Sequence, residues 1–288
     1  PKQRVRDIAA VRLALAGAFE TTVTVPTASP AATARRIWPR PAAAVIGALL
    51  VAIVTGLAVW SLTRPSPPAP RPPARFLLQT PPGVALNALS DVAISPAGTH
   101  VVYAAGGSDP REAQLYVRDV GALVATPLRG AEGGFEPFFS PDGQSVGFMG
   151  DSVGLIKRIS VYGGSATTII AWEAGVSGAS WGADETIVFG SSSGLMRVPA
   201  VGGLPEQLTT NDPGEANAHA YPDVLPNLAG VLFTVGSGSI EDSRIAVVSL
   251  KTGVTRDLLQ GGSHPRYSPT GHIIYSGVGG TLWAVGFD

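Results

Sequence analysis

Cysteine is absent from the 288-residue chain, which excludes thiolate catalysis, disulfide bonds and cysteine-ligated metal sites. Charge is also scarce, since only 14% of the residues are Asp, Glu, Lys or Arg and the net charge is −1. That total conceals a division, because residues 1–75 hold ten basic and two acidic side chains and the remainder carries a net charge of −9. An acidic domain would repel phosphate, so we expect no nucleic-acid partner, whereas the basic part suits the anionic surface of a membrane.

Charged residues are missing altogether from residues 42–62. A helix of this length covers roughly 30 Å at about 1.5 Å per residue, which is the thickness of a bilayer core. Arg40 and Arg64 flank the run, and Trp38 and Trp60 lie near its ends, as at membrane interfaces. The pattern predicts one continuous transmembrane helix over residues 42–62, separate from the domain that follows.

A twin-arginine export signal, formed by Arg35 and Arg36 ahead of the apolar run, is an alternative interpretation. The run is longer than the core of such a signal, and no small-residue cleavage site follows it cleanly. Arginines are equally frequent within about 20 residues of either side of the run, and the additional basic residues near the start favour a cytoplasmic N-terminus. We therefore expect a single-pass protein of the inner membrane with an extracytoplasmic C-terminal domain.

Small residues repeat every four positions along this run, at Ala44, Ala48, Ala52 and Gly56. Such a ridge lets two membrane helices approach closely, so it predicts a homodimer through this face. Ten of the 21 residues are Ala, Gly, Ser or Thr, so a ridge of this kind also arises by chance.

Residues 1–20 show apolar side chains at helical spacing, in a helix that Asp7 can cap. Residues 1–15, PKQRVRDIAAVRLAL, resemble the last helix of bacterial serine/threonine protein kinases, and Arg4 lies where that family keeps a structural arginine. The resemblance implies that residues 1–20 end a kinase domain whose catalytic residues and ATP and Mg²⁺ sites lie upstream. We accordingly expect no catalytic residue and no cofactor in this chain.

Two segments beside the apolar run are too poor in large apolar side chains to fold by themselves. Residues 21–41 hold four prolines and are interpreted as a juxtamembrane linker. Residues 63–75 contain six prolines, which favour polyproline II, so they predict a semi-rigid stalk of roughly 35–40 Å at about 3.1 Å per residue. The stalk is expected to hold the following domain away from the bilayer.

Five similar units follow, each with a short apolar strand, a turn and a second apolar strand. Their spacing is 45, 41, 44 and 43 residues when Ser95, Ser140, Trp181, Leu225 and Ser268 are aligned. A repeat near this length with four short strands per unit is typical of propeller blades. The sequence thus predicts a mainly β fold with four full antiparallel blades and a partial fifth that lacks its fourth strand.

The turn Ser140, Pro141, Asp142 and Gly143 has a structural part in this pattern, because Pro presets φ, Asp bonds backbone amides and Gly takes a positive φ. Together with the strand LYV at residues 115–117, it resembles the TolB-like (WD-repeat-like) propeller family. The resemblance covers residues 76–288 and implies a six-bladed ring. Four full blades and a partial fifth do not close such a ring, so we expect a chain truncated at both ends.

No residue constellation in the propeller indicates catalysis. Residues 190–194, GSSSG, fit a hydrolase pattern, but they lie between two expected strands where a helix would be required. His219 and His264 are placed just ahead of the first strands of successive blades, where both could face a central channel, although no carboxylate lies at ligand spacing. Acidic residues near the turns, namely Glu136, Asp184 and Asp223, are interpreted as turn caps, and Trp172, Trp181, Trp283, Phe138 and Phe139 as core between blades.

Three functional hypotheses remain. The first is the anchor and extracytoplasmic sensor of a receptor-like serine/threonine kinase, whose propeller binds a protein, peptide or glycan. The second is a membrane-anchored TolB-like scaffold for envelope protein assembly, and the third is the propeller half of a prolyl-oligopeptidase-type hydrolase. The coding sequence on either side of the chain distinguishes them.

Overall fold

The fold was analysed in a computed structural model, which describes residues 41–63, 77–78, 80, 84, 92–106, 112–150, 154–211, 218–236 and 238–287. The chain divides into two compact units, Pro1–Ala74 and Arg75–Asp288. The predicted helix over residues 1–20 lies outside the described residues, as do the linker and the stalk apart from their residues next to the apolar run.

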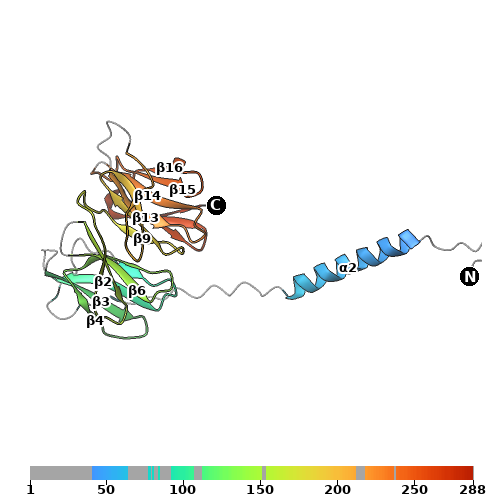
Figure 1. The fold of residues 1–288 in the computed structure, drawn as a ribbon, viewed down its shortest axis with the longest axis horizontal. Coiled ribbons are helices and arrows are strands. Elements are labelled where there is room, and N and C mark those ends of the chain that lie inside the picture. Colours follow the sequence, from blue (N-terminus) through green and yellow to red (C-terminus); the bar gives the residue numbers. More distant parts are fainter. Residues whose placement is uncertain are drawn as a thin grey trace, which may run out of the picture. The chain divides into compact units, whose positions relative to one another are not determined.

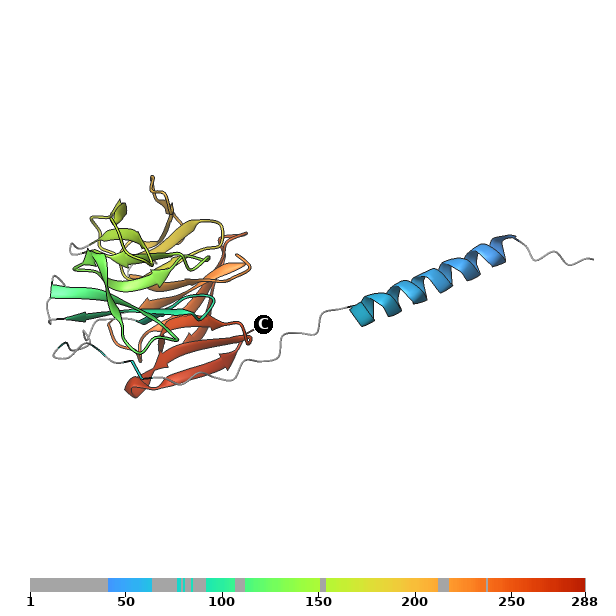
Figure 2. The ribbon, with the colours of Figure 1, turned by 90° about the horizontal axis from the view of Figure 1, so that it is seen from below.

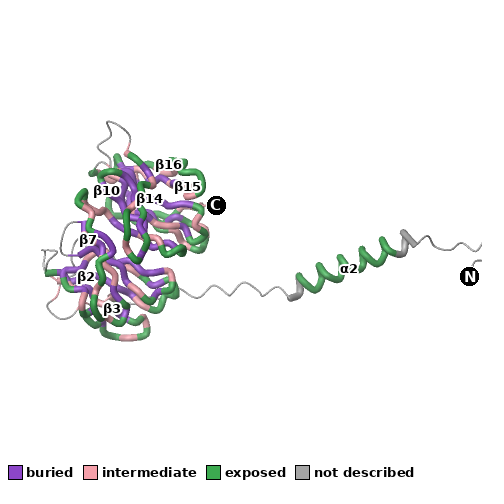
Figure 3. Tube along the Cα trace, viewed as in Figure 1, coloured by how far each residue is buried: buried purple, intermediate pink, exposed green. Residues whose placement is uncertain are grey.

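The first unit contains helix α2 (Pro41–Thr63), so the prediction of one continuous helix over residues 42–62 is confirmed. Its side chains are described for residues 45–60, and the large apolar ones are 53–66% exposed, as the green helix in Figure 3 shows. Within the described part of the chain, no helix combines the length and the hydropathy needed to cross a membrane. The transmembrane assignment of residues 42–62 is therefore not supported by the described residues.

The second unit consists of antiparallel sheets that follow one another along the chain (Figures 1 and 2). Each sheet forms because short runs of β-branched and aromatic residues are separated by turns rich in Gly, Pro and Asp. The first two blades have four strands each. They are β1 (Val92–Ile94), β2 (His100–Gly106), β3 (Ala113–Asp119) and β4 (Thr126–Glu132), then β5 (Phe135–Phe139), β6 (Ser145–Met149), β7 (Leu155–Ser160) and β8 (Thr167–Ala171).

The third and fourth blades also have four strands each, and one bridge between Ser191 and His219 joins them into an eight-stranded sheet. The fifth blade has three strands and a short 3-10 helix, η2 (Val278–Gly280), so the predicted blade pattern is confirmed for the described residues. The strands are β9 (Ala179–Trp181), β10 (Thr186–Ser191), β11 (Gly194–Pro199), β12 (Glu206–Gln207), β13 (Ala218–Val224), β14 (Gly230–Gly236), β15 (Arg244–Ser249), β16 (Thr255–Gln260), β17 (Gly262–Ser268), β18 (His272–Gly277) and β19 (Leu282–Gly286).

The turn between the first and second strands has the same hydrogen bond in all five blades, from the amide of its fourth residue to the carbonyl of its first. In the third blade this bond joins Glu185 to Gly182, so Gly182 and not Trp181 corresponds to Ser140. The sequence alignment was wrong by one residue there, because the turn lacks the proline that the other four turns have at their second position. The corrected spacing is 45, 42, 43 and 43 residues, from first residues Ser95, Ser140, Gly182, Leu225 and Ser268.

The apolar core lies between neighbouring blades and not within a single sheet. Phe139 and Phe148 pack with side chains of the first blade, and Phe138 packs with Trp181 and Phe189 of the third blade. Similar clusters join the third to the fourth blade and the fourth to the fifth. Figure 3 shows this core as purple strands. A blade buries both faces only between two neighbours, which makes the repeat cooperative.

Trp283 corrects one core prediction, since its side chain is 56% exposed, whereas Trp181 and Phe138 are buried. Trp283 lies on β19, the last strand described in the fifth blade, which pairs with β18. Its ring nitrogen donates a hydrogen bond of 2.8 Å to the Thr281 hydroxyl.

Candidate functional site

The first strands of the five blades, β1, β5, β9, β13 and β17, contact one another in sequence. They therefore form the inner wall of the arc of blades, where a propeller has its axial channel. Side chains from these strands converge on one region because successive blades are related by rotation about the axis. They provide the strongest candidate site among the described residues.

One equivalent position, within the first strand or, in the third blade, just before it, has a left-handed backbone in four successive blades. The φ angles are 46° at Glu136, 79° at Gly178, 50° at Tyr221 and 55° at His264. The corresponding residue of the first blade lies outside the described residues. A side chain at such a φ meets steric strain, which glycine avoids and the other three residues must bear.

The three strained residues share a local sequence and a local irregularity. Each precedes a proline, at Pro137, Pro222 and Pro265, and each lies where the pairing of its strand with the next shifts register. A β-bulge of this kind turns one side chain away from the alternation of the strand. We call these three residues, Glu136, Tyr221 and His264, the inner-strand ring. Sequence reasoning missed it, although the X-Pro dipeptides at the same point of three units were a usable signal.

Tyr221 and His264 lie face to face from neighbouring blades, with ring centroids 3.4 Å apart and planes inclined by 25°. The Tyr221 amide donates to the Ser177 carbonyl at 2.8 Å, and the His264 amide donates to the Thr234 hydroxyl at 3.0 Å. A Cβ added to Gly178 would come within 2.9 Å of the Tyr221 Cα. The stacked pair is thus held by both backbones and needs glycine beside it.

A second line of contacts joins the same strands two or three residues further on. The Ser180 hydroxyl accepts a hydrogen bond of 3.0 Å from the Val224 amide, and the Asp223 carboxylate accepts one of 2.7 Å from the Tyr267 amide. These contacts repeat from blade to blade, because Ser180 and Asp223 are 43 residues apart, as are the left-handed residues Tyr221 and His264.

We call this second line of contacts between neighbouring blades the seam. Arg266 completes it, since its guanidinium lies 3.7 Å from the Asp223 carboxylate and donates to the Pro222 carbonyl at 3.1 Å. Burial raises the pKa of the Asp223 carboxyl, while Arg266 and the Tyr267 amide act in the opposite direction. Asp223 therefore joins two blades, whereas the sequence had placed it as a turn cap.

The other predicted acidic positions fall in two places. Asp184 caps its turn as expected, since its carboxylate accepts hydrogen bonds from the hydroxyl and the amide of Thr186 at 2.7 and 3.3 Å. Glu136 lies in β5 as one of the left-handed residues and is half-buried, so it is not a turn cap.

The turn over residues 140–143 is stabilised by hydrogen bonds that its side chains make with the backbone and with each other. The Ser140 hydroxyl accepts the Ser145 amide at 2.9 Å, and Asp142 accepts the Ser140 hydroxyl at 2.5 Å and the Gln144 amide at 2.9 Å. These bonds lower the pKa of the Asp142 carboxyl, the Ser140 hydroxyl having the largest effect.

The structure does not bring the two predicted histidines together as a pair. His219 and His264 lie within β13 and β17 and not ahead of them, at positions that do not correspond. His219 is buried, with Nδ1 2.6 Å from the Thr209 hydroxyl and its ring against Phe233, while His264 Nδ1 lies 2.8 Å from the Ser263 hydroxyl. In the residues searched, no three His, Asp or Glu side chains gather as a metal site.

The GSSSG segment at residues 190–194 forms the turn between β10 and β11, so it lies between two strands as the sequence indicated. The Ser191 hydroxyl donates to the Gly194 carbonyl at 2.8 Å, and the Ser192 hydroxyl donates to the Ala174 carbonyl at 3.3 Å. Both hydroxyls stabilise backbone, and the strand–turn–helix elbow of a serine hydrolase is not formed here.

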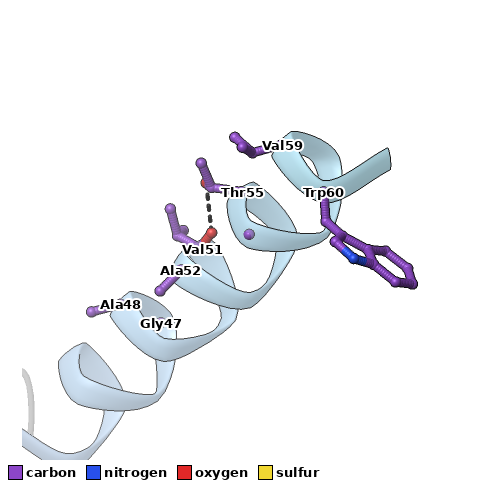
Figure 4. A pocket seen from close by; sticks show the side chains of 8 residues that line it. Gly47, Ala48, Val51, Ala52, Thr55, Val59 and Trp60 are labelled. Atoms are coloured by element: carbon purple, nitrogen blue, oxygen red, sulfur yellow. Dashed lines mark hydrogen bonds between the residues drawn. The ribbon is translucent and has the colours of Figure 1, made fainter. Parts of the chain in front are cut away.

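The helix of the first unit has a shallow groove along its small residues. It is lined by Ala48, Ala52 and Gly56, and Figure 4 shows the Thr55 hydroxyl beside it, donating to the Val51 carbonyl at 2.7 Å. The side chain of Ala44, the fourth residue of the predicted ridge, lies outside the described residues. Dimerisation through this face stays a prediction.

The fold and the inner-strand ring define a class of protein: a β-propeller with a candidate binding site near its axis. The sequence matches no known family model, and a search of curated proteins found no match.

Solved structures similar to the propeller include TolB from Acinetobacter baumannii, at 20% identity and a TM-score of 0.55, with 69% of this chain and 52% of TolB covered. A putative TolB from Agrobacterium tumefaciens has the same identity, with a TM-score of 0.53 and 69% and 76% of the two chains covered. A chain of a nidogen/laminin complex has 8% identity and a TM-score of 0.56, with 68% and 74% covered. The chain thus spans about half the length of the first of these proteins. Likeness at these identities shows the TolB-like propeller fold alone.

Proposed function

We propose that the propeller is the ligand-binding part of a membrane-anchored receptor and that its ligand contacts the inner-strand ring at Glu136, Tyr221 and His264. The observation that carries the proposal is the left-handed backbone at these equivalent positions. Each such residue costs on the order of 1–3 kcal/mol, and strain of this kind is concentrated at functional sites. A purely structural position would accept glycine, as the third blade does at Gly178.

The chemistry of the ring favours a protein, peptide or glycan ligand. The stacked rings of Tyr221 and His264 offer a flat surface with polar edges, and Glu136 adds a carboxylate in another blade. Aromatic faces together with hydrogen-bonding edges suit both peptide and sugar ligands.

The test uses the detergent-solubilised full chain, immobilised and probed with a phage-displayed random peptide library and a glycan array. We expect enriched binders whose affinity falls by about tenfold or more, equivalent to about 1.4 kcal/mol, in Tyr221→Ala and His264→Ala. Tyr162→Ala removes an exposed tyrosine outside the inner strands and is the matched control. Equal binding by all three variants at unchanged melting temperature would exclude the ring as the site.

We further propose that residues 42–62 anchor the protein in the inner membrane, with the N-terminus in the cytoplasm and the propeller outside it. Support comes from the uncharged run, the flanking arginines and the exposure of the apolar side chains along α2. Reconstitution in vesicles followed by protease treatment tests both points, because the propeller should be cleaved only from the extracytoplasmic side.

The resemblance of residues 1–15 to the last kinase helix supports a receptor-like serine/threonine kinase as the parent protein. ATP and Mg²⁺ would then act only in that upstream domain. Reading the frame upstream of Pro1 tests this directly: a kinase domain ending near Asp7 supports it, and a start codon close by excludes it.

A second candidate is a TolB-like scaffold in envelope protein assembly, anchored in the same way but without a kinase. The similarity of the propeller to two TolB structures favours it, although that similarity concerns the fold. The same upstream sequence separates this candidate from the receptor kinase, and the downstream sequence tests the hydrolase alternative.

A homodimer through α2 is the remaining proposed interaction. Small residues at Ala48, Ala52 and Gly56 would let two helices pack closely. Gly56→Ile should weaken dimerisation in a membrane two-hybrid assay, whereas Leu50→Ile, which lies outside the groove, should leave it unchanged.

A further inference from the structure

The turns between the third and fourth strands of the blades are unusually apolar for surface loops. In the first four blades they comprise residues 120–125, 161–166, 200–205 and 250–254, and Lys251 is the single charged residue among them. Turns normally expose polar residues to water, so a repeated apolar turn requires another explanation.

Six large apolar side chains in these turns are 54–91% exposed. We call them the apolar rim: Leu123, Val124, Tyr162, Val201, Leu204 and Val254. Each of the four turns contributes at least one of them. Scattered exposed apolar residues are normal in proteins, but a repeat at the same turn of every full blade is not scatter.

The four turns lie at one end of the blades, because alternate turns of an antiparallel sheet lie at the same end. Contacts between blades support this arrangement. The Gly164 amide in the second turn donates to the Arg129 carbonyl of the first blade at 3.1 Å, and a Cβ on Gly202 in the third turn would lie 3.1 Å from the Ile169 carbonyl oxygen of the second blade.

The chain enters the propeller at this same rim. Arg118, a buried residue of β3, donates from Nη1 to the Leu77 carbonyl at 2.5 Å and from Nε to the Ala122 carbonyl in the first turn at 2.9 Å. Leu77 is itself 78% exposed, next to the rim. Only residues 64–76 separate it from the end of α2, a reach of about 40 Å at roughly 3.1 Å per residue.

We propose that the apolar rim docks on the surface of a lipid bilayer, with the side chains of the four turns inserted at the headgroup level. The proposal rests on the proposed function, since the anchor keeps the rim close to the membrane. Exposed Leu, Val and Tyr side chains suit insertion into the interface. The strained residues lie within the inner strands β5, β13 and β17 and not in the four turns, so docking through the turns would not use their side chains.

The docked state differs from the stalk expected from sequence, in which residues 63–75 hold the propeller away from the bilayer. Arg64, Arg71 and Arg75 are the charged residues of residues 63–75, and basic side chains are attracted to a membrane surface. The two arrangements give opposite predictions for the environment of the rim.

The test uses the full chain in phosphatidylcholine vesicles, with one bimane label at a time on an introduced cysteine. The chain has no cysteine of its own, so each label reports one site. The rim is labelled in Leu204→Cys, and Ser193→Cys is the matched control in the opposite turn of the same blade. Leu50→Cys reports on the helix. Nitroxide-bearing phosphatidylcholine is the quencher.

We expect quenching of the labels at positions 204 and 50 and none at position 193. Quenching at position 50 alone, or equal quenching at positions 204 and 193, would overturn the docking and leave the anchor intact. Absence of quenching at both positions would overturn the anchor and the docking together. A label at position 204 can instead become shielded from water as the amount of protein per vesicle rises, with no quenching by the nitroxide lipid. That result would show contact between copies of the chain and exclude docking on the lipid surface.

Discussion

The turn of the second blade and the turns of the third and fourth blades adopt the same backbone from different sequences. Residues 140–143 have the favourable set Ser, Pro, Asp and Gly, whereas the third blade uses GADE and the fourth LPNL. The fourth residue is left-handed in all three, at Gly143, Glu185 and Leu228, with φ of 70°, 60° and 55°. The left-handed Glu185 and Leu228 cost energy that a glycine would avoid, so other contacts must offset it, and we infer that packing between blades is the main one.

Removing that packing should have the largest effect. Phe189 is fully buried in the third blade, with its ring 5.9 Å from that of Trp172. We expect Phe189→Ala to lower the free energy of unfolding by about 3–5 kcal/mol, measured by urea denaturation. A loss as small as that of a turn substitution would show that the turns and not the seams hold the third blade.

The best-formed turn should show a smaller loss. Ser140 is buried, and its hydroxyl bonds the Ser145 amide and Asp142. Ser140→Ala leaves these groups without that partner and should cost about 1–3 kcal/mol in the same experiment. The control is Ser165→Ala, in an exposed turn of the same blade, which should be nearly neutral.

Substitutions at the fourth turn position should change the free energy of unfolding in opposite directions, depending on whether the turn has a glycine there or another residue. Gly143→Ala places a Cβ at positive φ and should cost about 1 kcal/mol, since no atom closer than 3.6 Å obstructs it. Glu185→Gly removes the same strain and should gain about 0.5–1 kcal/mol, partly offset by the entropy of the unfolded chain. Leu228→Gly should gain less, because its half-buried side chain loses contacts. Thermal unfolding of the three variants measures this, and a loss of stability in Glu185→Gly would contradict strain at that turn.

The smallest expected effects are on the pH dependence of stability. Asp142 in the turn and Asp223 in the seam should change the free energy of unfolding with pH in opposite directions. The folded-state pKa of Asp142 is lowered, so its contribution is present above the unfolded pKa and is lost as pH falls through the folded pKa. The folded-state pKa of Asp223 is raised, so its contribution is present below the unfolded pKa and is lost as pH rises through the folded pKa.

Urea unfolding of Asp142→Asn and Asp223→Asn from about pH 3 to 7 measures these slopes. Relative to the unsubstituted protein, Asp142→Asn should become less stable as pH rises. Asp223→Asn should become relatively more stable over the same range. Slopes of the same sign would contradict one of the two environments.

Much of the propeller could be predicted because its signals are local. Alternating apolar residues, Gly-rich turns and a repeat near 43 residues determined the number of blades and the order of their strands. The register failed only at Trp181, where the turn lacks the proline that the other four turns share. The continuous helix over residues 42–62 was predictable for the same reason, since a helix needs only local hydrogen bonds and an apolar run.

The sequence by itself determined the repeat, the strands and the apolar helix, because each depends on residues close together in the chain. Only the tertiary structure decided which residues meet across blades. The stacking of Tyr221 on His264, the Asp223 seam and the apolar rim all arise from residues that belong to different blades. Their geometry depends on the rotation between sheets, which follows from side-chain packing at the seams and not from the pattern of any single unit.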